Sequence, residues 1–215
     1  DFDRALCDEL EPSPEYDKPR LYSIVKLLEK LYLWFVRRIF STDTKGWLKD
    51  LIVANSDWTG NILTKYYGLK VRTLYPPVWN KFSHIPFDKR ENGFVWIGTF
   101  APHREIETTI EILGKVRTRG HNIHLHIIGW GYSDKYIKMI KDIQLQHSDW
   151  VFLEGRCGVE KKVKIIAEHH YGINSRKKEP FGIAVAEMVK AGCIVFCPND
   201  GGQVEIVGDE RVVYN

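Results

Sequence analysis

The sequence has few cysteines and no long apolar run, and each shortage excludes a class of protein. Its four cysteines are too few and too scattered for a disulfide scaffold, so we expect small core residues in a reducing compartment. No stretch approaches the roughly 20 apolar residues of a transmembrane helix, and the acidic start "DFDRALCDEL" is unlike a signal peptide. These shortages predict a soluble, cytoplasmic chain.

The chain also has almost no excess of charge. It carries 31 basic and 28 acidic residues, a formal net charge of +3, which gives little support for a nucleic-acid-binding surface. Hydrophobic residues fill 44% of its 215 positions, which is enough for one packed core and part of another. It begins without a methionine, so we expect it to be part of a longer polypeptide.

The organisation changes in the segment 76–93, where Pro76, Pro77 and Pro86 interrupt regular structure among polar residues. We interpret this segment as a linker. In residues 94–215, short apolar runs then alternate with amphipathic helical patterns. Strands separated by helices should pair in parallel through right-handed crossovers. This part is therefore predicted to be a Rossmann-like, doubly wound α/β domain with its ligand site at the carboxyl ends of the strands.

The individual elements follow from these patterns. The strands are expected at residues 94–98, 124–131, 150–155, 171–175, 193–198 and 211–215, and the helices at residues 105–117, 134–146, 159–170 and 179–192.

Residues 1–75 have a different pattern. A long helical pattern covers residues 20–40, and it is followed by an apolar run at 51–56, a helix at 57–68 and a second run at 71–78. Two strands cannot make a sheet domain, so we interpret residues 1–75 as the C-terminal remnant of an N-terminal α/β domain. Residues 21–40 mix aromatic with basic side chains; packing within that domain is the favoured reading, and a helix in the membrane interface is the alternative.

The stretch "EPFGIAVAEMVKAG" holds two glutamates, Glu179 and Glu187, eight positions apart. Pro180 suits the first turn of a helix, so the helix should begin near Glu179. The free N–H groups around Phe181, Gly182 and Ile183 would then form an anion site. The two carboxylates would lie roughly 12 Å apart on one helix face. That separation suits an elongated ligand such as a nucleotide-sugar, with one carboxylate at the sugar and the other at the ribose.

Several motifs in order carry a resemblance to a known family. "EPFGIAVAE" resembles the Glu-x7-Glu element of the retaining GT-B glycosyltransferases of family 4. "FVWIGTFAPHREIE", "HLHIIGWG" and "GGQVEIV" are similar to further motifs of that family, so the resemblance covers about residues 94–207. The upstream "NSDWT" and "YPPV" resemble the lipid-linked oligosaccharide α-1,2-mannosyltransferases within the family.

The resemblance implies roles for particular residues. Glu179 would be the catalytic carboxylate beside the donor sugar, Glu187 would accept hydrogen bonds from the ribose, and Arg104 would be the catalytic cation at the diphosphate. Thr99 stands where the family has an arginine, so the missing charge would come from His103 or Arg156. The remaining donor-binding positions implied are Gly98, Phe181, Gly182, Ile183, Gly201 and Gly202.

The implied function is hexose transfer, with mannose from GDP-mannose favoured, to a glycan or lipid-linked acceptor. The resemblance implies a GT-B fold and no cofactor or metal. Peripheral contact with the cytoplasmic membrane face belongs to the alternative reading of residues 21–40. We expect this chain alone to bind the donor weakly and to transfer nothing, because the acceptor side of the cleft is represented only by its last elements. A non-catalytic nucleotide- or sugar-binding module is the alternative, and a nucleotide-sugar epimerase is a weaker third reading.

Two other groups of residues, a glycine pair and a set of histidines, are interpreted as structural rather than as ligand-binding. Gly129 and Gly131 lack the third glycine and the acidic residue of a dinucleotide fingerprint, so a tight turn at a strand end is favoured. His124 and His126 share one strand face, and His169 adjoins His170. No carboxylate or cysteine completes a ligand set by spacing, so the sequence disfavours a metal site.

Overall fold

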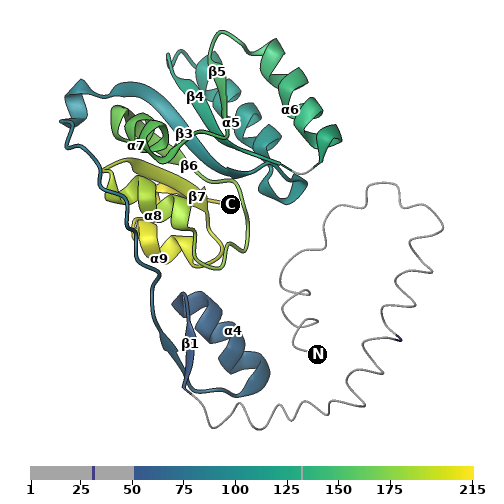
Figure 1. The fold of residues 1–215 in the computed structure, drawn as a ribbon, viewed down its shortest axis with the longest axis vertical. Coiled ribbons are helices and arrows are strands. Elements are labelled where there is room, and N and C mark those ends of the chain that lie inside the picture. Colours follow the sequence, from purple (N-terminus) through teal and green to yellow (C-terminus); the bar gives the residue numbers. More distant parts are fainter. Residues whose placement is uncertain (1–30, 32–50, 132) are drawn as a thin grey trace.

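The computed structural model describes residue 31 and residues 51–131 and 133–215 (Figure 1). The helix predicted over residues 20–40, and the membrane contact given as the alternative for residues 21–40, lie outside these ranges except for residue 31. No helix in the described ranges is long and apolar enough to cross a membrane.

The C-terminal part is built on a sheet of six strands, and every neighbouring pair in it is parallel. The predicted doubly wound α/β fold is therefore confirmed. The strands are β3 (Glu91–Thr99), β4 (His124–Trp130), β5 (Val151–Gly155), β6 (His169–Ile173), β7 (Ile194–Pro198) and β8 (Val213–Tyr214). The helices are α5 (Ile106–Thr118), α6 (Asp134–Gln146), α7 (Val159–Glu168), α8 (Ile183–Lys190) and α9 (Gln203–Val207), with short 3-10 turns η1 (Phe87–Lys89), η2 (Pro102–Arg104) and η3 (Glu210–Val212).

Helices cover both faces of this sheet (Figure 1). Phe94 and Trp96 of β3 pack toward α5 and α6, in a cluster that includes the buried Ile110 and Ile140. The intervening Val95 packs on the opposite face, where α7 and α8 supply residues such as Ile166, Val185 and Met188. Successive side chains of a strand point to opposite faces, so a strand that is apolar at every position has both faces buried.

The strand order places an open crevice at the carboxyl edge of the sheet. The order across the sheet is β5-β4-β3-β6-β7-β8. Along the chain, β4 and β5 are added on one side of β3, and β6, β7 and β8 are then added on its other side. The connections after β3 and β6 therefore leave the sheet on opposite sides. Such a reversal point is where parallel α/β sheets bind their ligands.

The helix predicted to begin near Glu179 begins at Ile183 instead. Residues 178–182 form a turn in which Lys178 (φ 50°) and Gly182 (φ 96°) both have left-handed backbone conformations. An α-helix cannot continue through such residues, so Pro180 lies outside the helix. The predicted separation of about 12 Å along one helix face therefore does not apply to Glu179 and Glu187.

Three other boundaries differ from the prediction. The strand β3 begins at Glu91, inside the segment assigned to the linker. His169 and His170 start β6 rather than ending α7, because the chain is already extended at His169 (φ −110°, ψ 150°). The "GGQVEIV" stretch, which lies outside the predicted strands and helices, ends in the short helix α9.

The N-terminal part is a small β-α-β unit made of β1 (Ile52–Ala54), α4 (Asp57–Tyr67) and β2 (Val71–Thr73), with the two strands parallel. The strand predicted at 51–56 and the helix predicted at 57–68 are confirmed, whereas the run at 71–78 forms a strand only over Val71–Thr73. Ser56 caps the helix by accepting a hydrogen bond from the Thr59 N–H at 3.0 Å, and Gly68 ends it in a left-handed conformation.

Hydrogen bonds hold this unit against the C-terminal part. The Ser56 hydroxyl donates to the Pro180 carbonyl at 2.5 Å. The Glu205 carboxylate of α9 accepts from the N–H groups of Asp57 (2.9 Å) and Trp58 (2.6 Å), at the positive end of α4. The Tyr75 hydroxyl also donates to Glu205, which raises the pKa of Tyr75 to about 12. The β-α-β unit is thus anchored beside the turn that carries Glu179.

Candidate functional site

A cleft of about 580 Å³ opens at the carboxyl edge of the six-stranded sheet. This volume is in the range of about 300–1,000 Å³ that is typical of small-molecule sites. Its walls are the ends of β3, β4 and β5, the turn before α8, and two residues of the N-terminal part, Asn55 and Pro76. The cleft therefore lies between the two parts of the chain.

Three arginines and one glutamate are the charged residues that line this cleft in the described part of the chain. Arg104 Nη1 lies 2.8 Å from Glu179 Oε2, and Arg176 Nη1 lies 3.2 Å from the same oxygen. The Arg156 guanidinium lies over the Trp130 ring, 5.3 Å from its centroid. Glu179 is only 9% exposed. The excess of positive charge in a partly enclosed space favours a polyanionic ligand such as a diphosphate.

Arg104 has unused donor capacity. Its guanidinium is largely buried, which lowers its pKa from the usual value, and Glu179 partly offsets that effect. Its Nε is buried without a hydrogen-bond partner among the described residues. A buried donor without a partner is costly. Because this Nε is shielded from solvent, a bound anion would accept from the other nitrogens of the Arg104 guanidinium.

His103 does not supply the charge that Thr99 lacks. His103 is not among the residues that line the cleft, and burial with the nearby Arg176 and Arg104 lowers its pKa from the ordinary value, which disfavours its charged form. Arg156 and Arg176 line the cleft and provide the additional positive charge.

The N-terminus of α8 faces the cleft. Phe181, Gly182, Ile183 and Ala184 all line it. Gly182 caps the helix without a side-chain hydrogen bond, and its own N–H and those of the next three residues lack partners within the helix. Because the helix begins later than expected, these free groups belong to residues 182–185. Together with the helix dipole they form a site for negative charge.

Glycines let the ends of β3 and β4 approach each other at the floor of the cleft. Gly98 and Thr99 line the cleft at the end of β3, and Gly98 pairs with Gly129 of β4. A Cβ on Gly129 would lie 1.8 Å from the Gly98 carbonyl oxygen, and one on Gly131 would lie 2.3 Å from the Phe100 oxygen. These close contacts explain why positions 129 and 131 are glycines, so a dinucleotide-binding motif is not needed to account for them.

Gly201 and Gly202 do not line the cleft. They contact the backbone of Glu179 instead. Gly201 forms a parallel bridge with Glu179, and the Gly202 N–H donates to the Glu179 carbonyl at 2.8 Å. Gly201 has φ 89°, and a Cβ there would lie 2.4 Å from that carbonyl oxygen. The glycine pair therefore fixes the backbone that presents Glu179.

Glu187 lies within α8 and is not among the residues that line the cleft. It is 6% exposed, and Lys162 Nζ of α7 donates to both of its oxygens, at 2.7 and 2.9 Å. The Asn80 side-chain amide also donates to Glu187 Oε1. It lies one helical turn beyond Ile183, which does line the cleft. The structure thus brings Glu179 and Arg104 together and places Glu187 in a separate buried ion pair.

Sequence reasoning missed Arg176 and Lys162. Arg176 begins a basic run, "RKK", directly before Glu179, and that run could have indicated a further cation at the site. Lys162 gave no such signal, because it reaches Glu187 from a helix 25 positions upstream in the chain.

Comparisons with known proteins identify the family and the fold. The sequence profile of the family described as glycosyl transferases group 1 matches residues 78–214. A relative from Candida glabrata is 28% identical over 167 residues, which is 69% of this chain and 33% of that protein. A Mus musculus relative is 24% identical over 215 residues, or 88% of this chain and 42% of that protein. Both are named "GDP-Man:Man(3)GlcNAc(2)-PP-Dol alpha-1,2-mannosyltransferase". The chain thus spans well under half the length of these relatives.

Solved structures of glycosyltransferases share the fold. The complex named GtfA/B aligns with a TM-score of 0.61 and 16% identity, over 77% of this chain and 33% of that chain. The lipopolysaccharide glycosyltransferase WaaG aligns with a TM-score of 0.58 and 17% identity, over 73% of this chain and 46% of that chain.

Proposed function

Because the chain belongs to the glycosyl transferases group 1 family, we propose that its cleft binds the nucleotide diphosphate sugar of a retaining hexosyltransferase. The observation that carries this proposal is the Arg104–Glu179–Arg176 group, which faces the cleft together with the free N–H groups at the start of α8. Cations and a helix N-terminus would hold the diphosphate, and the carboxylate would lie beside the sugar.

The residues have distinct tasks in this proposal. Arg104 and the α8 N-terminus stabilise the charge that develops on the diphosphate as its bond to the sugar C1 breaks. Glu179 faces the sugar and stabilises the positive charge that develops on its ring. The acceptor oxygen bonds to C1 on the face that the diphosphate leaves, and its proton passes to the departing phosphate. The arginine side chains at the cleft neutralise the diphosphate charge, the role that a bound metal ion would otherwise have.

The expected substrates follow from the named relatives. We propose mannose from GDP-mannose as the transferred group and a lipid-linked oligosaccharide as the acceptor, since these appear in the names of the relatives. A lipid-linked acceptor would bring transfer to the cytoplasmic face of a membrane.

Glu187 and Lys162 are proposed to act on the nucleotide. Ile183 lies at the cleft and Glu187 follows it by one turn of α8, so a ribose bound over the start of α8 would lie within reach of this ion pair. The non-catalytic alternative rests on the missing charge at Thr99 and on how little of the acceptor side the chain contains. Arg176 offsets the missing charge, so transfer is proposed for the longer polypeptide and donor binding for this chain alone.

Nucleotide choice is the first test of this function. At about 100 times its dissociation constant, a ligand that binds only the folded state stabilises it by about 2.7 kcal/mol, or about 5 to 10 °C in melting temperature for a chain of this length. We expect GDP to raise the melting temperature of this chain more than UDP or ADP does. Equal shifts would remove the mannosyl assignment and leave the glycosyltransferase assignment standing. A complete lack of shift with all three would contradict the proposed site.

A further inference from the structure

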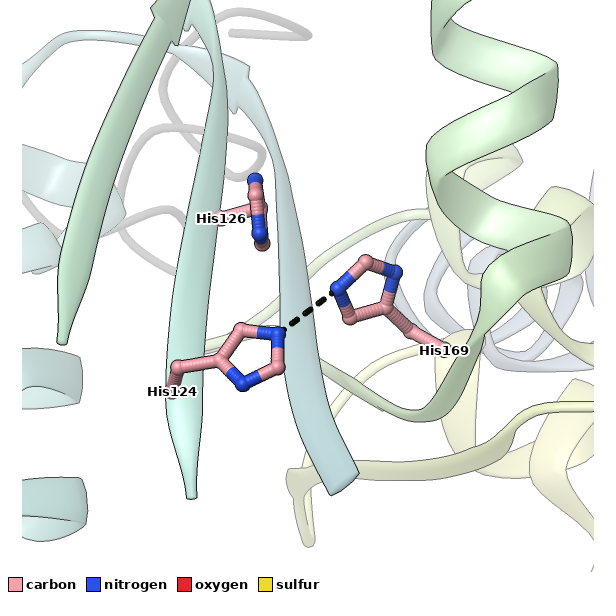
Figure 2. Close-up of side chains that lie close together, drawn as sticks. All are labelled: His124, His126 and His169. Atoms are coloured by element: carbon pink, nitrogen blue, oxygen red, sulfur yellow. Dashed lines mark hydrogen bonds between the residues drawn. The ribbon is translucent and has the colours of Figure 1, made fainter. Parts of the chain in front are cut away.

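Three histidines converge on one face of the sheet, far from the cleft. His124 and His126 come from β4, and His169 comes from the start of β6 (Figure 2). Each histidine has a ring nitrogen that lies within 4.8 Å of a ring nitrogen of the other two. Nε2 of His124 lies 2.9 Å from Nε2 of His169. Figure 2 shows the three rings gathered in one space beside β3.

The backbone leaves room for this cluster. Gly93 of β3 pairs with His124, and a Cβ at Gly93 would lie 2.3 Å from His124 Nε2. Any other residue at position 93 would therefore occupy the space that the His124 ring fills. The Phe152 ring of β5 packs on His126, with ring centroids 5.0 Å apart, and shields the other side.

Two of the rings are oriented by partners at their outer nitrogens. His169 Nδ1 donates to the Ile165 carbonyl at 2.6 Å, and His126 Nδ1 donates to Glu154 Oε1 at 2.7 Å. Glu154 is itself held by Lys161 at 2.6 Å. Carbonyl and carboxylate oxygens can only accept, so both rings carry their proton on Nδ1 and keep a lone pair on Nε2. Metal-binding histidines have this same arrangement of outer partners.

A carboxylate lies beside two of the three imidazoles. Glu91 Oε2 is 3.5 Å from His124 Nε2 and 4.0 Å from His169 Nε2. The Glu91 side chain is 58% exposed, so it can rotate toward the rings, and an ion can reach them from solvent on that side. Sequence spacing gave no ligand set because these residues come from three strands between positions 91 and 169.

We propose that His124, His126 and His169 bind a divalent cation of the zinc class, with Glu91 as the fourth ligand. Imidazole nitrogens with one carboxylate suit zinc and its neighbours in the first transition series. A tetrahedral ion with Zn–N distances of about 2.0–2.1 Å places its ligand nitrogens roughly 3.3 Å apart. The ring nitrogens need move only on the order of 1 Å or less from their present separations to reach that geometry.

The ion would be structural rather than catalytic. Glu91 begins β3, and Thr99 at the cleft ends it, so the two sites are separated by roughly 26 Å of extended strand. The ligands come from β3, β4 and β6, the three central strands of the sheet. A bound cation would therefore tie together the centre of the sheet at the edge opposite the donor cleft.

Metal titration of the purified 215-residue chain tests this site. After treatment with a chelator, we expect the chain to bind one equivalent of Zn²⁺ in calorimetry, and one equivalent of Co²⁺ with the visible absorption of a tetrahedral site. His124→Gln and His126→Gln should each weaken Zn²⁺ binding by more than the about 10- to 100-fold typical of losing an outer-shell partner, and Glu154→Gln should weaken it within that range. Glu91→Gln should change the cobalt spectrum.

The control is His121→Gln, since His121 is an exposed histidine three positions before His124. It should bind both metals as the parent does. His169 is buried, so the variants are made at the two more accessible histidines, and circular dichroism confirms that each is folded. Absence of cobalt absorption in the parent, or full binding in a folded His124→Gln/His126→Gln double variant, would overturn the proposal.

Discussion

Replacing Arg104 with alanine is expected to weaken GDP binding by about 10- to 150-fold, the equivalent of about 1.5–3 kcal/mol for hydrogen bonds to a charged group. Arg104 has a buried Nε without a partner among the described residues, and it lies at the carboxyl edge where a diphosphate would meet the α8 N-terminus. Calorimetric titration of the parent and the variant with GDP measures the difference.

Two further variants show whether the effect belongs to the guanidinium. Arg104→Lys should fall between the parent and the alanine variant, because lysine keeps the charge but loses the planar fork of donors. Arg119→Ala removes an exposed arginine just after α5 and should leave the affinity unchanged. An Arg104→Ala variant that bound GDP as tightly as the parent would show that the diphosphate lies elsewhere.

Glu187→Ala is expected to lower the free energy of unfolding by about 3 kcal/mol, the lower end of the range for breaking a buried ion pair. The change removes the partner of Lys162, whose side chain is 22% exposed and retains some access to water. For a chain of this length the melting temperature should fall by roughly 6 to 12 °C. GDP affinity should also fall, by about 1.5–3 kcal/mol, if the carboxylate accepts from the ribose.

A double variant separates these two effects. Glu187→Leu combined with Lys162→Met replaces the pair with apolar side chains, a change that is often neutral or stabilising for a buried pair. The melting temperature should return toward that of the parent, whereas GDP binding should stay weak. Recovery of both would mean that Glu187 acts through packing alone, which would sink the ribose assignment.

Much of the fold could be predicted from the sequence because its signals are local. The helix expected at 134–146 was found at Asp134–Gln146, and the alternation of apolar runs with amphipathic patterns correctly indicated a parallel sheet. Prediction failed where tertiary geometry decides a boundary. The Lys178–Gly182 turn delays α8 by four residues, although Pro180 would have suited its first turn.

The site was predictable only in part, because tertiary contacts decide which residues meet at the cleft. Arg104 and Glu179 were chosen from motifs, and the fold brings them within 2.8 Å of each other. Gly201 and Gly202 belong to the same motif set, yet they hold the Glu179 backbone rather than face the cleft. The Glu187–Lys162 pair and the histidine cluster join residues from separate helices and strands, and such contacts leave no trace in spacing along the chain.

The most direct test of the central claim compares GDP-mannose with GDP in calorimetric titrations of the parent and of Glu179→Gln. If the cleft holds a nucleotide-sugar with its sugar at Glu179, the substitution should weaken GDP-mannose binding by about 10-fold or more. It should not weaken GDP binding, because GDP lacks the sugar, and the loss of the carboxylate charge leaves Arg104 and Arg176 free for the diphosphate. Equal losses for the two ligands, or an unchanged affinity for GDP-mannose, would contradict the account.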